Sequence, residues 1–323
     1  DPTDFNIVQG NVSQTNSGVG AQTLESALAG SNVVIQTVAS GGEAGDINVN
    51  ADLTWSANKL TLEAHGDINV NAVVTVSGTS TLDLKTGWDG NSYDTTKFVR
   101  MQMDSGINQF TGKINFTDGV GGLRGGDGIL TINNQAYTLI NSLGNSHTDT
   151  ALGTLQGMQG DLTRNYALAG NIDASQTILC DGMKGFLPIA GGDESNGVFF
   201  TGNFNGLGHT VNALFIQRNA ENGVGLFGKV RSTGTDISLS NVNIQSAYVS
   251  GIDYVGILVG DLKKISGSVH VHNVNSSGSV VSVNNGGGLI GGWDSATGDR
   301  MHSSASVGAN MSAGGLIGAA FGG

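Results

Sequence analysis

Aromatic side chains with polar neighbours are the residues of this sequence best suited to hold a ligand. Trp88 and Tyr93 stand at the two ends of the polar stretch Asp89-Gly90-Asn91-Ser92. An aromatic face beside Asn and Asp side chains suits the apolar face of a sugar ring. We therefore take Trp88 and Tyr93 as the first candidates for glycan binding, with Trp293 and Trp55 as further candidates.

Metal binding is the second kind of chemistry to consider. His270 and His272 are two positions apart, so on a strand they share a face and could bind a divalent metal ion. No third ligand is near them in the sequence, which favours an exposed histidine pair instead. The glycine-rich stretch from Gly121 to Gly128 resembles calcium-binding loops, but it occurs once, which favours a turn. We predict no metal site and no cofactor.

Catalysis on polysaccharides is the third possibility. A glycosidase needs two carboxylates roughly 5 to 9.5 Å apart across a cleft. Asp181, Asp193 and Glu194 are the best candidates, because they lie in an irregular region between two sets of repeats. Adjacent acids in a glycine-rich loop usually only solvate it, however, and Lys263 and Lys264, as bases of a lyase, have no acidic cluster beside them. We predict that the chain is not an enzyme, with a glycan-active enzyme as the alternative.

Repeated short strands are the elements that must position these side chains. The segment Gly45-Asp46-Ile47-Asn48-Val49-Asn50-Ala51 returns unchanged at 66–72, an offset of 21 residues. Its alternating apolar residues are typical of a strand with one buried face, and a strand so short must stack on its copy to share a core. Strands with Leu60 and Leu62, then Leu82 and Leu84, recur between the copies, so each coil has more than one face. Stacking in register places Asn48 over Asn69 and Asn50 over Asn71, about 4.8 Å apart.

A second family of repeats begins after Ile189. Its units combine glycines with Leu and a second apolar residue, and their Leu positions are offset by 32, 31 and 27 residues. The glycines let the backbone pass close to the neighbouring coil while the two apolar side chains enter the core. The units are Val224-Gly225-Leu226-Phe227-Gly228, Val255-Gly256-Ile257-Leu258-Val259-Gly260, Gly287-Gly288-Leu289-Ile290-Gly291 and Gly314-Gly315-Leu316-Ile317-Gly318.

The composition suits a repeat protein with a polar, weakly charged surface. The 323 residues include 53 Gly, 12% are charged, and the net charge is −12. The 14 Lys and Arg residues are scattered, which disfavours nucleic acid as a partner. No apolar run reaches the roughly 18 residues of a membrane-spanning segment, so we predict no membrane insertion. Cys180 is the single cysteine, which we interpret as a small buried side chain.

These patterns predict an all-β protein, a right-handed parallel β-helix with a short helical cap or insertion. Residues 1–140 form a β-solenoid with an excursion at about 88–104. Residues 141–199 form an irregular connector with a short helix between Asp149 and Leu162. Residues 200–323 form the second solenoid, which is expected to continue beyond the chain end. A helix around Leu24 to Leu28 could cover the open end of the first stack.

The four glycine-rich units resemble the GLUG motif of bacterial surface proteins. The region from Asp1 through the Gly-Asp-Ile-Asn-Val-Asn copies to Met158 is similar to filamentous-haemagglutinin-like exoproteins of bacterial two-partner secretion. The resemblance implies a secreted or cell-surface adhesin or biofilm scaffold, exported by an outer-membrane transporter and contacting a host receptor or polysaccharide. The Asn-Pro-Asn motifs of the family's secretion domain are absent, so that domain would lie upstream of Asp1. An inert stalk of a larger effector, such as a contact-dependent toxin, is a further alternative.

Overall fold

The chain forms two compact units, Asp1–Leu139 and Ile140–Gly323, which we call unit 1 and unit 2. The structure is a computed structural model that describes residues 4–38, 43–104, 106–192 and 197–321. Both units consist mainly of parallel β-strands, and the described residues contain one α-helix, α1 (Ala21–Gly30). The prediction of an all-β chain is confirmed at this level.

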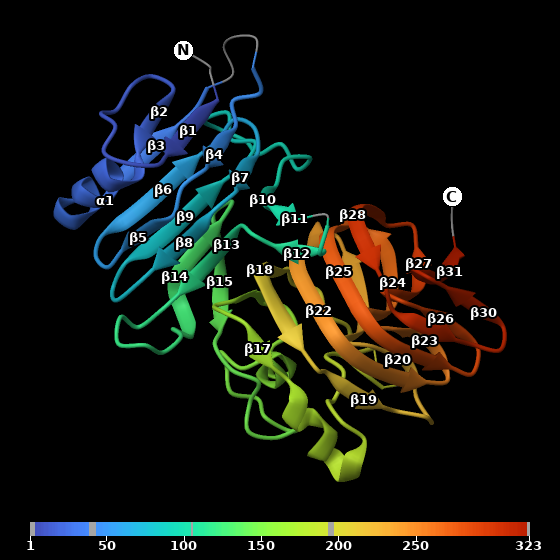
Figure 1. Ribbon diagram of the computed structural model, residues 1–323. Helices are drawn as coiled ribbons and strands as arrows, with labels where there is room; N and C mark the ends of the chain where they lie inside the picture. The colour runs from blue at the N-terminus through green and yellow to red at the C-terminus, as the bar shows by residue number, and fades with distance from the viewer. Residues whose placement is uncertain (1–3, 39–42, 105, 193–196, 322–323) are drawn as a thin grey trace. The chain divides into compact units, whose positions relative to one another are not determined.

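From β4 onward, successive strands of unit 1 join three sheets in a repeating order (Figure 1). β4, β5 and β6 belong to different sheets, and β7, β8 and β9 then join the same sheets in the same order. The first sheet contains β1 (Phe5–Val8), β2 (Gly18–Gly20), β4 (Ile47–Val49), β7 (Ile68–Val70) and β10 (Val99–Met101). The second contains β5 (Leu53–Trp55), β8 (Val73–Val76) and β13 (Lys113–Phe116). The third contains β3 (Val33–Gln36), β6 (Lys59–Glu63), β9 (Thr81–Lys85), β14 (Gly126–Ile132) and β15 (Gln135–Ile140).

The two identical copies lie side by side in register. Ile47 pairs with Ile68 and Val49 with Val70, and all four side chains are at most 1% exposed. The Asn69 amide donates to Asn48 Oδ1 at 3.0 Å, and the Asn71 amide donates to Asn50 Oδ1 at 2.7 Å. The predicted asparagine ladder is therefore confirmed, with the apolar residues inside and the stacked amides outside.

The segment predicted as an excursion over 88–104 leaves the sheet for a shorter stretch. β10 returns to the first sheet, with Val99 over Ile68 and Met101 over Val70. It returns because Val99 and Met101 repeat the apolar alternation of the copies. Arg100 stands at the ladder position of Asn69, and its Nε donates to Asp67 Oδ2 at 2.9 Å. The two short strands that follow, β11 (Met103–Asp104) and β12 (Gln109–Phe110), form an antiparallel hairpin.

Helix α1 covers the terminal strand of the second sheet, as predicted. It buries Ala21, Leu24 and Leu28 and contacts β5, which lies at the edge of that sheet. The Glu25 carboxylate accepts a hydrogen bond from the amide of Thr54 at 2.7 Å. This bond satisfies an edge amide that another strand would otherwise pair with.

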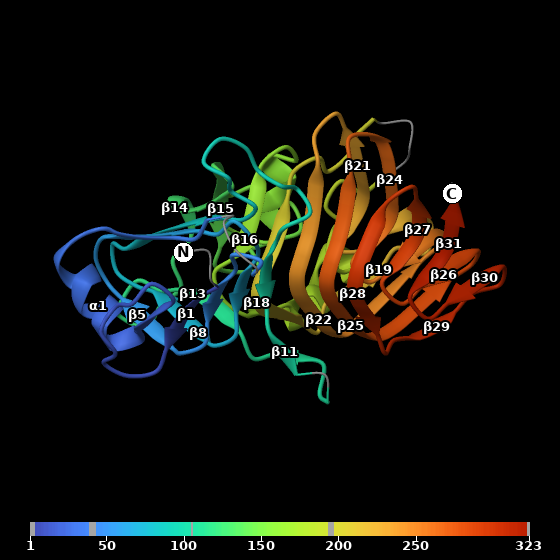
Figure 2. The same cartoon turned by 90° about the horizontal axis from the view of Figure 1, so that it is seen from above.

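In unit 2 successive strands also join three sheets in turn, and the strands of its largest sheet are longer (Figures 1 and 2). One sheet contains β16 (Asn165–Leu168), β17 (Ile172–Asp173), β18 (Phe204–Asn212), β19 (Phe215–Gln217), β22 (Ile237–Gly251), β25 (Val269–Ser282), β28 (Thr297–Ser303) and β29 (Ser306–Gly308). A second contains β20 (Asn222–Val224), β23 (Asp253–Gly256), β26 (Asn285–Gly287) and β30 (Ser312–Gly314). A third contains β21 (Phe227–Thr233), β24 (Val259–Ser266), β27 (Ile290–Asp294) and β31 (Ile317–Phe321).

The four glycine-rich units form the corners between the second and third sheets of unit 2. In register, Phe227 lies over Val259, Val259 over Ile290 and Ile290 over Ile317, which reproduces the offsets 32, 31 and 27. The Leu226 and Leu289 side chains are fully buried at these corners. At Gly256 and Gly287 the chains approach so closely that an added Cβ would lie 2.5 Å and 2.0 Å from a backbone oxygen, so only glycine fits there. The predicted crossing is confirmed at these corners.

The short helix predicted between Asp149 and Leu162 is only a 3₁₀ turn, η1 (Gln156–Gly160). Asp149 instead closes a preceding turn by accepting the Ala151 amide at 2.8 Å. Gly157 sits so close to Ala151 that an added Cβ would lie 1.9 Å from its carbonyl oxygen. This crowding, with three glycines between Asp149 and Leu162, keeps the chain out of a regular α-helix. Two further turns, η2 (Ser175–Leu179) and η3 (Asp181–Met183), follow.

A second asparagine ladder runs inside unit 2. Asn241 donates to Asn205 Oδ1 at 3.1 Å and accepts from Asn273 Nδ2 at 2.7 Å. Asn241 and Asn273 both have left-handed backbones, with φ of 53° and 57°. Asn adopts this conformation at lower cost than most residues and can use its amide locally. The ladder therefore stabilises an irregular bend that recurs in successive strands.

Candidate functional site

Trp88 and Tyr93 form a half-buried aromatic pair on unit 1. They face each other across a tight antiparallel bridge, with ring centroids 4.7 Å apart and ring planes inclined by 37°. The turn between them is held by Asp89, whose carboxylate accepts the amides of Ser92 at 2.6 Å and Asn91 at 2.8 Å. These hydrogen bonds, that of the Ser92 amide first, lower the pKa of Asp89. The turn is therefore fully braced at neutral pH and loses this support as acid protonates Asp89.

Charged side chains of the third sheet border this pair. Lys85 lies 5.3 Å from the centre of the Trp88 ring and donates to Glu63 at 2.7 Å. That hydrogen bond raises the pKa of Lys85, so the amine is cationic at neutral pH. Burial raises the pKa of Tyr93, and its hydroxyl oxygen is buried with no hydrogen-bond partner. The site thus combines two rings, a cation, an anion and one hydroxyl with unused hydrogen-bonding capacity.

The other tryptophans lie in or against cores. Trp55 is 4% exposed, and its indole NH donates to the Asn58 carbonyl oxygen at 3.3 Å. Trp293 stands at the register position of the buried Leu262 and packs against the core of unit 2. Among the predicted aromatic candidates, Trp88 and Tyr93 are the two that the structure brings together.

The predicted histidine pair divides between two environments. His272 is 3% exposed, with Nε2 3.2 Å from Ser238 Oγ, whereas His270 is half-buried, with Nδ1 2.6 Å from Thr297 Oγ1. The expected exposed pair is therefore wrong for His272, because its strand lies between two others whose side chains cover it. Within the described ranges, no three His, Cys, Asp or Glu side chains are grouped to hold a metal ion. The stretch 121–128 follows a turn closed by Asp118, which accepts the Val120 and Gly122 amides at 2.8 Å.

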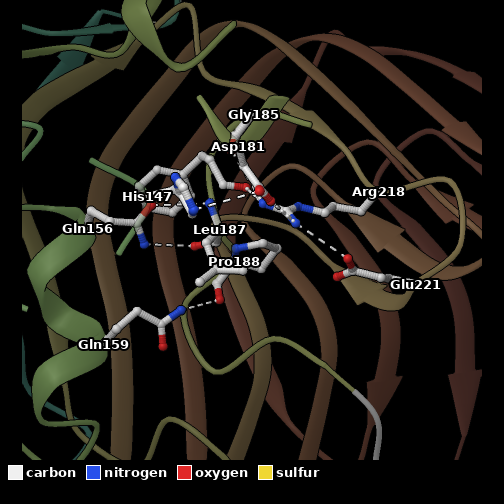
Figure 3. Close-up of polar contacts among 10 residues, drawn as sticks. His147, Gln156, Gln159, Asp181, Gly185, Leu187, Pro188, Arg218 and Glu221 are labelled. Atoms are coloured by element: carbon white, nitrogen blue, oxygen red, sulfur yellow. Dashed lines mark hydrogen bonds and ion pairs between the residues drawn. The ribbon is translucent and has the colours of Figure 1, made fainter. Parts of the chain in front are cut away.

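Asp181 lies in an ion-pair cluster of unit 2 that the sequence did not indicate (Figure 3). Arg218, with 4% of its side chain exposed, donates to Asp181 Oδ2 at 2.7 Å and to Glu221 at 3.4 Å. His147 Nε2 lies 3.6 Å from the other Asp181 oxygen. Arg218 also donates to the carbonyl oxygens of Gly185 and Phe186 at 3.4 Å. These contacts assign Asp181 to holding its loop in place. Asp193 and Glu194 lie outside the described residues.

Two glutamines of η1 hold the neighbouring segment in the same view (Figure 3). Gln156 donates to the Leu187 carbonyl at 3.0 Å and accepts the Leu187 amide at 3.1 Å. Gln159 donates to the Pro188 carbonyl at 2.5 Å and accepts the Ala190 amide at 3.2 Å. Each side-chain amide thus replaces the pair of hydrogen bonds that a neighbouring strand would supply. These hydrogen bonds hold residues 187–190, which belong to none of the named strands, in place.

A second aromatic pair, Phe215 and Tyr248, was missed by the sequence analysis. The two residues are register partners on β19 and β22, and their half-buried rings stack with centroids 5.2 Å apart and planes 15° apart. They are 33 positions apart, close to the repeat offsets of 32 and 31. This similarity in spacing is the feature of the sequence that indicates that the two residues could be neighbours.

The fold is that of a protein built from stacked parallel strands. A part of the amino-acid sequence is similar to a known protein. Over 147 residues the chain is 37% identical to halomucin of Haloquadratum walsbyi, a match that covers 44% of this chain and 2% of halomucin. Halomucin is a large archaeal surface protein. The chain thus spans a very small part of this relative's length. No protein-family model and no solved structure matches the chain. No helix among the described residues has the length and apolar character needed to cross a membrane.

Proposed function

We propose that this chain is a non-catalytic scaffold segment of a secreted or cell-surface protein. In this proposal its coils wind as a right-handed parallel β-helix, and the outer faces contact a receptor or polysaccharide. The same proposal includes export through an outer-membrane transporter of the two-partner kind. This part is based on the resemblance of the repeats to filamentous-haemagglutinin-like exoproteins. The observation that carries the scaffold role is the parallel, in-register pairing of recurring strands, such as β4 with β7 in unit 1 and β24 with β27 in unit 2.

Two features support the β-helix. In unit 1 the chain visits its three sheets in the same order from β4 onward, and β4, β7 and β10 lie parallel to one another. Parallel strands linked by a crossover are right-handed in about 98% of cases. In unit 2 the glycine-rich corners recur in register, so successive passes keep the same outline.

The similarity to halomucin, a surface protein, supports the location, and cell labelling tests it. An antibody raised against residues 1–323 is expected to label intact cells of the source organism or to detect the protein in the medium. Protease added to intact cells is expected to remove the cell-bound label, while a cytoplasmic marker protein persists. Label that appears only after lysis, with none in the medium, would contradict the surface role.

Glycan contact at Trp88 and Tyr93 is the part of the proposal that point variants test. Trp88→Ala is expected to weaken binding to a glycan array at least about tenfold, because it removes one ring and the partner of the other. Tyr93→Phe is the matched variant. We expect it to raise the free energy of unfolding by about 1 kcal/mol, since the buried hydroxyl has no partner, and to keep the binding, since a buried hydroxyl does not reach a sugar at the surface.

Urea unfolding measures the stability of the wild-type chain and both variants. Trp55→Phe, in the core, is the control that changes a tryptophan without touching the pair. Array binding that is unchanged in Trp88→Ala would remove this site from the proposal.

A further inference from the structure

The outer face of the largest sheet of unit 2 carries a stack of two aromatic rings, and serines occupy the next two positions across the sheet. Four register partners, one on each of β19, β22, β25 and β29, form a column across the strands. In order they are Phe215, Tyr248, Ser279 and Ser306. The next residues along, Ile216, Val249 and Val280, are fully buried, so alternation directs the column outward. We call Ser279 and Ser306 the serine ledge.

The two sides of the aromatic stack differ. On the side of Phe215, Phe186 donates its amide to the Phe215 carbonyl at 2.9 Å. A Cβ added to Gly185 would lie 2.9 Å from the Phe215 ring, so the chain there is pressed against that side. On the side of Tyr248, the next two positions are serines. Among the described residues, the ring packed against Tyr248 is that of Phe215. The far face of Tyr248 therefore overlooks the serine ledge.

The positions beside this ring face are uncharged. The neighbouring column, two residues along each strand, contains Gln217, Ser250, Val281 and Gly308, and Ser250 is only 1% exposed. Val281 is 45% exposed, and Ser250 donates its hydroxyl to Asn219 at 2.8 Å. Neither column contains Lys, Arg, Asp or Glu. A ligand that fits needs a flat apolar face for the ring and hydroxyl groups for the serines, with no charge.

We propose that Tyr248 and the serine ledge form a binding subsite for a neutral polysaccharide. One pyranose ring stacks its C–H face on the free face of Tyr248 and exchanges hydrogen bonds with Ser279 and Ser306. Phe215 supports Tyr248 from behind and has no contact with the sugar. The subsite extends the proposed scaffold role and is independent of Trp88 and Tyr93, which lie on unit 1.

Affinity electrophoresis of the full chain tests the subsite. Native gels contain soluble dextran, mannan or barley β-glucan, because a polymer raises the weak affinity of a single stacked sugar through multiple attachment. Alginate, an acidic polysaccharide, is the charged comparison. We expect at least one neutral polymer to retard the protein and alginate to have no effect. Tyr248→Leu is expected to reduce the retardation about tenfold.

Matched variants separate the subsite from general damage and from the other aromatic pair. Phe215→Leu truncates the supporting ring, Tyr248→Phe keeps the aromatic face, and Trp88→Ala removes the unit 1 candidate. Phe215→Leu and Tyr248→Phe are expected to keep most of the retardation, and Trp88→Ala is expected to keep the part of it that Tyr248 supplies. Thermal unfolding by circular dichroism checks that Tyr248→Leu is folded. No retardation by any neutral polymer, or a folded Tyr248→Leu variant retarded like the wild type, would overturn the subsite. Loss in Trp88→Ala with retention in Tyr248→Leu would transfer the binding to the unit 1 pair.

Discussion

Replacing Gly256 by Ala is expected to destabilise unit 2 by about 4 kcal/mol, a large fraction of the stability of an ordinary domain. Gly256 lies at a corner where the chain passes its neighbours at close range. A Cβ there would lie 2.5 Å from the Val259 oxygen and 2.6 Å from the Gly291 nitrogen, and both are backbone atoms that cannot rotate away. Urea unfolding followed by circular dichroism measures the loss.

Gly315→Ala is the matched control for this prediction. Gly315 belongs to the last of the four glycine-rich units, its φ is not in the left-handed region, and a Cβ there would meet nothing within 4 Å. We expect this variant to change the free energy of unfolding by less than about 0.5 kcal/mol. Equal losses in the two variants would show that the glycines matter for chain flexibility and not for close approach.

Replacing Asn241 by Ala is expected to cost about 3 kcal/mol. Asn241 is fully buried, and its side chain both donates to Asn205 and accepts from Asn273. Truncation deprives the Asn273 amide of this acceptor inside the protein, and Ala tolerates the left-handed backbone less well than Asn. The free energy of unfolding of unit 2, again from urea titration, measures the effect.

Ser246→Ala separates the two causes of this loss. Ser246 lies on the same strand with a φ of 54°, close to the 53° of Asn241, but its side chain is exposed. We expect a loss below about 0.5 kcal/mol, because no buried hydrogen bond is removed. A loss in Ser246→Ala as large as that in Asn241→Ala would assign the whole effect to backbone conformation and count against the buried ladder.

The candidate sites were predictable to the extent that their residues are close in sequence. Trp88 and Tyr93 flank one turn, so their meeting required only a local bend. Phe215 and Tyr248 meet because β19 pairs with β22, and a repeat offset of 32 places position 247 over Phe215. A difference of one residue decides which side chain points outward. Sequence spacing therefore identified the first pair and left the second undetermined.

Charged contacts were the least predictable feature. Asp181 was selected as a candidate acid, but nothing near it in the sequence identifies Arg218 as its partner, since the two are 37 positions apart. His272 was expected to be exposed, and the strands on either side of β25 bury it. Burial and ion pairing depend on neighbours from other strands and turns, which a single segment does not contain.

The amino-acid sequence alone determined the strand pattern, the in-register pairing of the two identical copies, the covering helix α1 and the glycine corners. Each of these follows from the alternation of apolar and polar residues, from the exact repetition of a segment, or from glycines placed where two backbones pass close together. The tertiary structure alone decided the internal asparagine ladder, the Asp181 ion pairs and the stacking of Tyr248 on Phe215. These groups meet because strands and turns that are far apart in the sequence pack side by side, and the local pattern around each residue does not indicate its partner.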